Sequence, residues 1–193
     1  MNYCLITTFN LYFRFEKTNY MIKKLLPFEK LVYHSTLRKE ELIVHLQNEI
    51  EAEKTFSFGA RKSSYSKPYI GKTYLNRFEI KKVVNYRNSF LPVIKGEIKE
   101  GINGAKIDVK MGLADFVKAF MILWLGGVSL GCIGALYSLI FTNTVNADAG
   151  FFMFIPFVML LLGLAMVSFG FKTESQKSIK DLEEILQAKI IER

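Results

Sequence analysis

The chain has 193 residues, half of them hydrophobic, and a formal net charge of +8 at pH 7. A chain of this length favours one or two domains. Its only cysteines, Cys4 and Cys132, indicate neither a disulfide framework nor a metal site. No recognition motif accompanies the basic charge, so we expect no nucleic-acid partner.

The first twenty residues are apolar in patches, too short to span a membrane, and lack the basic start of a signal peptide. Met21 then opens a stretch that reads like a natural protein start. We therefore expect residues 1–20 to be a start-site extension or a disordered tail. The first domain is predicted to cover residues 21–113.

A helix is predicted from Leu37 to about Lys54, because Leu42, Leu46 and Ile50 recur at a spacing of four. Ser35 or Thr36 supplies its N-cap. The narrow apolar side predicts that this helix packs against the domain that follows.

A Ser-rich loop at 56–68 precedes a section of alternating apolar and polar residues. This alternation predicts four antiparallel strands, at 69–75, 77–84, 90–99 and 105–113. Asn103-Gly104 is the strongest short hairpin signal in the chain. The expected fold class is α+β, a small antiparallel sheet with the helix at 37–54 covering one face.

The stretch Tyr86 to Gly96, YRNSFLPVIKG, is the most distinctive, and Asn103, Gly104, Lys106 and Ile107 follow it. It resembles the pattern Y-R-N-S-F-x-P-x-I-x-G of a family of uncharacterised bacterial membrane proteins. The resemblance covers roughly 28–171 and implies a small, possibly pleckstrin-homology-like β domain followed by two transmembrane helices. The chain has Ala105 and Gly112 where that family has Thr and Arg. The resemblance implies no activity.

Candidate catalytic residues are scarce. Ser89 lacks the G-x-S-x-G surroundings of an activated nucleophile, and His34 and His45 have no ligand cluster around them. We therefore expect no catalytic, metal or cofactor site. Asn88 and Ser89 are interpreted as turn residues that cap their own backbone, with Arg87 free to meet a carboxylate or a lipid phosphate.

Two apolar runs from Ala119 to Phe171 are free of Asp, Glu, Lys and Arg, apart from the polar link at 142–149 with its single acid, Asp148. Each run is about 22–23 residues long, and about 20 apolar residues match a helix across the bilayer core. The residues 114–171 therefore predict a transmembrane hairpin in the inner membrane. Lysines flank both outer ends and are absent from the link, which predicts cytoplasmic termini.

Small residues mark the predicted spans. Gly127, Gly131 and Ala135 lie in the first, and Gly163 and Gly170 in the second. Small residues let helix backbones approach closely. We expect these positions to line either the contact within the hairpin or a homodimer contact.

The tail at 172–193 predicts a further, amphipathic cytoplasmic helix. Thr173 and Gln176 form a capping box at its start. Five apolar residues form one stripe along it: Ile179, Leu182, Ile185, Leu186 and Ile190. Packing of this stripe within the chain or against another copy is the preferred interpretation.

We expect a non-enzymatic membrane module that binds anionic membrane lipid or a protein partner at the cytoplasmic face and assembles as a homo-oligomer. The candidate contact residues are Lys81, Lys82, Arg87, Asn88, Lys95 and Lys99. Two alternatives stay open. A membrane-bound enzyme acting on lipid or envelope precursors would need clustered acids or histidines, and a small oligomeric pore would need a polar stripe along a span.

Overall fold

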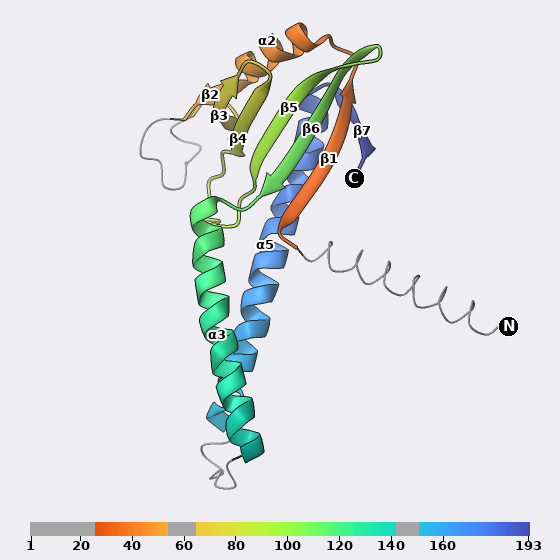
Figure 1. Cartoon of the computed structure of the whole chain (residues 1–193). Helices are drawn as coiled ribbons and strands as arrows, with labels where there is room; N and C mark the ends of the chain where they lie inside the picture. Colours follow the sequence, from red (N-terminus) through yellow and green to blue (C-terminus); the bar gives the residue numbers. More distant parts are fainter. Residues whose placement is uncertain (1–25, 54–64, 142–150) are drawn as a thin grey trace, which may run out of the picture.

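The computed structural model describes residues 26–53, 65–141 and 151–193 and has an α+β architecture, with a sheet at one end of two long helices (Figure 1). The predictions for residues 1–20, for the link at 142–149 and for most of the loop at 56–68 lie outside the described residues. The elements in chain order are β1 (Phe28–Ser35), α2 (Lys39–Glu49), β2 (Ile50–Ala52), β3 (Tyr69–Tyr74), β4 (Arg77–Lys82), β5 (Val93–Gly101), β6 (Gly104–Gly112), α3 (Asp115–Phe141), α5 (Ile155–Ile185) and β7 (Ala188–Glu192).

The sheet has the strand order β2-β3-β4-β5-β6-β1-β7. All neighbouring pairs are antiparallel except β2 and β3, which are parallel. The four predicted strands are confirmed as the meander β3 to β6. The prediction of only four strands is wrong, because β1 and β7 extend the sheet beyond β6 and β2 extends it beyond β3.

The turn between β5 and β6 is the predicted Asn-Gly hairpin. Gly101 pairs with Gly104 across it, and Asn103 has a φ of 61°. Gly104 has a φ of 144°, and a Cβ there would lie 2.0 Å from the carbonyl oxygen of Ser35. Only glycine fits this position, since both the backbone conformation and the close approach of β1 exclude a side chain.

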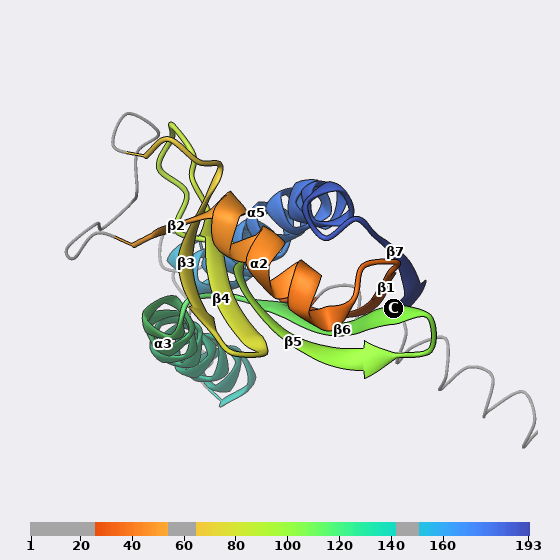
Figure 2. The same ribbon diagram turned by 90° about the horizontal axis from the view of Figure 1, so that it is seen from above.

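The two faces of the sheet differ. One face packs against α2 and the last turns of α5, as the view from above shows (Figure 2). Leu42 and Leu46 of α2 and Leu182 of α5 are almost completely buried there. The strands contribute every second residue to this core, including Leu31, Tyr33, Ile80, Ile94, Ile107, Val109 and Met111. We call the opposite side, which no described helix covers, the outer face.

Helix α2 confirms the predicted packing against the sheet but is shorter than predicted. It begins after Arg38, whose backbone N–H and guanidinium both donate to the Glu41 carboxylate, and it ends at Glu49. Ser35 does not cap it; its hydroxyl instead donates to the carbonyl of Leu186 at 2.9 Å. Residues 50–52 pair with β3 as strand β2, so sheet pairing ends the helix where the sequence pattern would continue it.

The tail differs most from the sequence prediction. No new helix begins at Thr173, because α5 runs without a break from the second apolar run to Ile185. The predicted capping box therefore lies inside a helix. Residues 188–192 form strand β7 against β1. The apolar stripe does pack within the chain, with Ile179, Leu182 and Leu186 buried against the sheet.

Helices α3 and α5 contact each other, and both are long and apolar enough to cross a membrane. Large apolar side chains on α3 face outward: Ile122 is 74% exposed and Leu123 is 78% exposed.

A buried carboxylate fixes the sheet to α5 at the end where it meets these helices. Glu29 of β1 accepts a hydrogen bond from Lys172 of α5 at 2.7 Å and another from Arg193 at 3.3 Å.

Candidate anion-binding face

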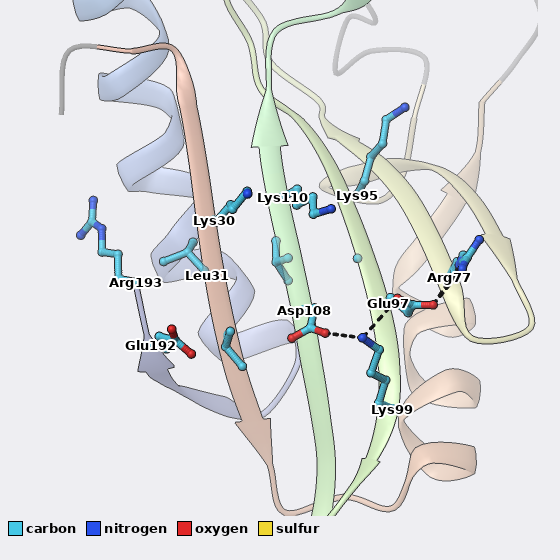
Figure 3. Close-up of a pocket in the computed structure, with 13 residues that line it drawn as sticks. Lys30, Leu31, Arg77, Lys95, Glu97, Lys99, Asp108, Lys110, Glu192 and Arg193 are labelled. Carbon is cyan, nitrogen blue, oxygen red and sulfur yellow. Dashed lines mark hydrogen bonds and ion pairs between the residues drawn. The ribbon is translucent and has the colours of Figure 1, made fainter. Parts of the chain in front are cut away.

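The strand alternation that builds the core also builds the charged outer face. In β5 and β6 the residues between the core positions are Lys, Asp and Glu, and β1 contributes Lys30 to the same face. Because successive side chains of a strand point to opposite sides, these charges all project from the uncovered face. Figure 3 shows them over the curved strands.

Three lysines meet at one level of this face. Lys30 of β1 is paired in register with Lys110 of β6, and Lys110 is paired with Lys95 of β5. We call these three residues the lysine row. It lies two residues from Phe28, Gly112 and Val93, which form the end of the sheet that adjoins α3 and α5.

The next level along the strands is acidic, and two of its three acids are paired with cations. The third, Glu192 of β7, lies directly opposite Val32 and has no cation at ion-pair distance among the described residues. Asp108 accepts from Lys99 at 2.6 Å, and Glu97 accepts from Arg77 at 2.9 Å and lies 3.4 Å from Lys99 (Figure 3). The Arg77 guanidinium, assisted by Lys99, lowers the pKa of the Glu97 carboxyl. The Asp108 carboxylate in turn raises the pKa of Lys99. Asp108 and Glu97 are therefore paired with Lys99 and Arg77, and not with the lysine row.

Two carboxylates near the lysine row, Glu79 and Asp115, act on Lys95. The pKa of Asp115 is lowered by Lys118 and, to a smaller extent, by Lys95. Lys95 lies 3.3 Å from Glu79, while the Lys30 ammonium sits over the Phe28 ring, 5.5 Å from its centroid. Within the described residues, neither Lys30 nor Lys110 has a carboxylate at ion-pair distance. Two positive charges on neighbouring strands are thus uncompensated.

A fourth lysine extends the basic region toward the helices. A Cβ on Gly112 would lie 3.8 Å from Cε of Lys118, so this α3 side chain reaches back over the sheet. Lys118 is paired with Asp115 at 2.8 Å.

The outer face also contains a hollow of about 530 Å³, lined by the lysine row and by Val32, Gly96 and Val109 among others.

The six predicted contact residues are dispersed. Lys95 and Lys99 lie on the outer face, and Lys81 lies 3.4 Å from Glu53. Lys82 is on the opposite face, where it is paired with Asp181 of α5, which also accepts a hydrogen bond from Tyr69 at 2.9 Å. Arg87 and Asn88 lie in the loop between β4 and β5 and not on a strand of the outer face.

This loop packs on α5. A Cβ on Gly170 would lie 2.8 Å from the ring of Phe90, so the aromatic ring rests directly on the helix backbone. The Asn88 side chain accepts a hydrogen bond from the Phe90 N–H at 2.9 Å, as the turn interpretation requires. Burial raises the pKa of the Tyr86 hydroxyl, and the nearby Glu174 carboxylate raises it further. Arg87 is exposed.

The small residues of the long helices fall into two groups. Gly163 lies beneath the Trp124 ring, because a Cβ on Gly163 would be 2.2 Å from a carbon of that ring. Gly131 lies against Pro156. Both therefore lie at the contact between α3 and α5. Gly127, in contrast, has no atom within 4 Å of its Cβ position, and Ala135 is half-buried.

Comparison with known proteins adds no identity. No protein family, curated protein or solved structure matches the chain. The structure does contain a β domain followed by two long apolar helices, which is the architecture that the motif resemblance implies.

Sequence reasoning missed Lys30 and Lys110 as members of the candidate site. The sequence gives only a weak signal for β1, because Leu31 and Tyr33 alternate with outward residues while Glu29 and Ser35 interrupt the apolar inward positions. The alignment of the three lysines depends on strand register, which only the structure provides.

Proposed function

We propose that the chain is a two-span integral membrane protein whose sheet domain binds anionic lipid headgroups at the cytoplasmic face. Two observations support the membrane location. Both α3 and α5 are long and apolar enough to span a bilayer, and the large side chains of α3 are mostly exposed in the isolated chain. Hydrocarbon chains of lipids would cover such side chains, whereas water would not.

The orientation rests on charge. Lysines flank the sheet-side ends of both spans, with Lys110 and Lys118 before the first and Lys172 and Lys177 after the second. Basic residues near span ends favour the cytoplasmic side. In this arrangement the sheet and both termini are cytoplasmic.

The lysine row is the single observation that carries the lipid proposal. Its residues lie two positions from the sheet end that adjoins the helices, about 7 Å at the usual strand rise. The cytoplasmic leaflet has a negative surface potential that attracts clustered lysines near a span. The uncompensated ammonium groups of Lys30 and Lys110 are therefore within reach of the headgroup layer.

The loop between β4 and β5 supports the same proposal. Phe90 packs on Gly170 at the end of the second apolar run, so this loop lies at the level where α5 would leave the membrane. The exposed Arg87 would then be at the headgroups, where its guanidinium can bind a phosphate in a bidentate way.

The full chain, purified in a nonionic detergent, can be tested by native mass spectrometry. Lipid adducts are counted after addition of phosphatidylglycerol and phosphatidylcholine in equal amounts. The variant Lys30→Gln/Lys95→Gln/Lys110→Gln should lose the preference for phosphatidylglycerol. A matched control, Lys106→Gln/Lys180→Gln/Lys189→Gln, removes the same net charge from exposed positions away from the row and should keep it. Equal effects of the two variants would refute the proposed site, since only net charge would then matter.

A further inference from the structure

The lysine row has a definite width. Its three residues come from adjacent strands, which lie about 4.8 Å apart, so the backbones of Lys30 and Lys95 are separated by roughly 10 Å with Lys110 between them. A lysine ammonium is a compact charge with three donors on a flexible stem. Three such side chains can converge on a single group that lies over Lys110.

The charge of the row is also definite. Glu79 shares Lys95, while Asp108 and Glu97 of the neighbouring level are held by Lys99 and Arg77, which leaves Glu192 as the unpaired acid of that level. Among the described residues, the excess within the row itself is two positive charges, those of Lys30 and Lys110. Like charges placed directly opposite each other across strands destabilise a sheet, so a bound dianion would remove an unfavourable interaction as well as form new contacts.

We propose that the lysine row binds a phosphomonoester group, a terminal phosphate that carries close to two negative charges. This inference rests on the proposed function and specifies the ligand of the same face. A phosphomonoester has a charge of about −1.5 to −2 at pH 7 and three terminal acceptor oxygens, which equals the number of converging lysines. A phosphodiester such as phosphatidylglycerol has one charge and two terminal oxygens, and so would leave part of the row uncompensated.

The surroundings of the row accommodate more than a phosphate. The hollow of about 530 Å³ is lined by the row, by Val32 and Gly96, and by three acids, Glu97, Asp108 and Glu192, so an uncharged remainder of the ligand can lie over Val32 and Gly96. The same chemistry is offered by a lipid with a terminal phosphate and by a soluble phosphate ester. The experiment therefore has an arm for each source.

In the lipid arm, the full chain is placed in phosphatidylcholine nanodiscs that contain either 10% phosphatidic acid or 20% phosphatidylglycerol, so that the two have similar surface charge. Lipids retained on the protein are then counted by native mass spectrometry. We expect roughly tenfold enrichment of phosphatidic acid over phosphatidylglycerol, with the enrichment lost in Lys30→Gln/Lys110→Gln and kept in Lys72→Gln/Lys106→Gln. In the solute arm, the phosphorus resonance of glycerol 3-phosphate is followed with nanodiscs of phosphatidylcholine alone, with dimethyl phosphate as the diester control.

The outcomes are distinguishable. Enrichment of phosphatidic acid supports a lipid source, and selective broadening of the glycerol 3-phosphate resonance that depends on Lys30 and Lys110 supports a soluble one. Equal retention of both anionic lipids above phosphatidylcholine, with no broadening, overturns the phosphomonoester inference but leaves the proposed function intact. Retention no higher than that of phosphatidylcholine, again with no broadening, overturns both.

Discussion

Replacing Lys110 with glutamine should stabilise the ligand-free protein, although it removes a residue of the proposed site. Lys110 is the centre of the lysine row and is directly opposite Lys30 on one side and Lys95 on the other. Cross-strand pairs contribute roughly 0.2–1 kcal/mol each, and like charges act unfavourably. The side chains are exposed to solvent, so the lower half of that range applies to each pair.

Relief of two such pairs gives about 1 kcal/mol in favour of Lys110→Gln. For a domain of about 100 residues this raises the midpoint of thermal unfolding by roughly 4 °C. The midpoint is measured by circular dichroism on the full chain in a nonionic detergent, without added anionic lipid. The gain should disappear in 1 M salt, where the screening length falls to about 3 Å.

Lys72→Gln is the matched control, because Lys72 is also a lysine on the outer face but is directly opposite Glu79. Its replacement removes a favourable pair and should leave the midpoint unchanged or slightly lower. A lower midpoint for Lys110→Gln would refute the reasoning. A gain that persists in 1 M salt would do so as well, since it would come from strand propensity and not from charge.

Three further predictions concern how the domain is held together. Gly163→Ala should destabilise the contact between the long helices by about 1–3 kcal/mol, because the new Cβ overlaps the Trp124 ring. Adding Trp124→Leu should restore part of this loss, as measured in a double-mutant cycle of unfolding midpoints. Glu29→Gln should cost about 1–3 kcal/mol, because it leaves the largely buried ammonium of Lys172 without its carboxylate; a loss under 0.5 kcal/mol would argue against the ion pair. The lowered pKa of Glu97 means that its stabilising contribution is present above about pH 4.5 and is lost as the pH falls through the folded-state value. Glu97→Gln should therefore flatten the acid limb of a stability profile below about pH 4.5.

The sequence predicted the elements that local patterns determine. Alternation located the meander from Tyr69 to Gly112, and Asn103-Gly104 located its hairpin, because a type of turn and a half-buried strand leave direct signals in the sequence. Length and apolar composition likewise located the two long helices. Each of these signals can be read without knowing what the segment packs against.

The missed elements are those that long-range pairing determines. The apolar stripe of the tail continues at helical spacing to Ile190, yet the helix ends at Ile185 because residues 188–192 complete the sheet beside β1. Gln187, with a φ of 44°, marks the turn between the two. In β1 the inward position of Glu29 hides the strand, since a buried carboxylate interrupts the apolar alternation. Only its partners, Lys172 on α5 and Arg193 just after β7, explain it.

The candidate site could be predicted only in part, because its membership depends on long-range strand pairing. The prediction included Lys95 as one basic residue among several, but nothing local distinguishes it from Lys82, which the structure places on the opposite face beside Asp181. Lys95 belongs to a row only because β5, β6 and β1 pair in one particular register. A one-residue shift of register would move the lysines of one strand to the core face and abolish the row.

The lysine row is held at a fixed height above the apolar helices. Strand β6 leads into α3 after Leu113 and Ala114, and α5 continues without interruption from the second apolar run into the core of the sheet domain. Glu29 adds a third attachment, because it binds Lys172 on the inner side of β1 while the adjacent Lys30 projects from the outer face. A domain on a flexible tether would sample many distances from the bilayer. Three attachments instead keep these lysines at one level relative to the long helices, so the proposed binding would not require ordering of a linker.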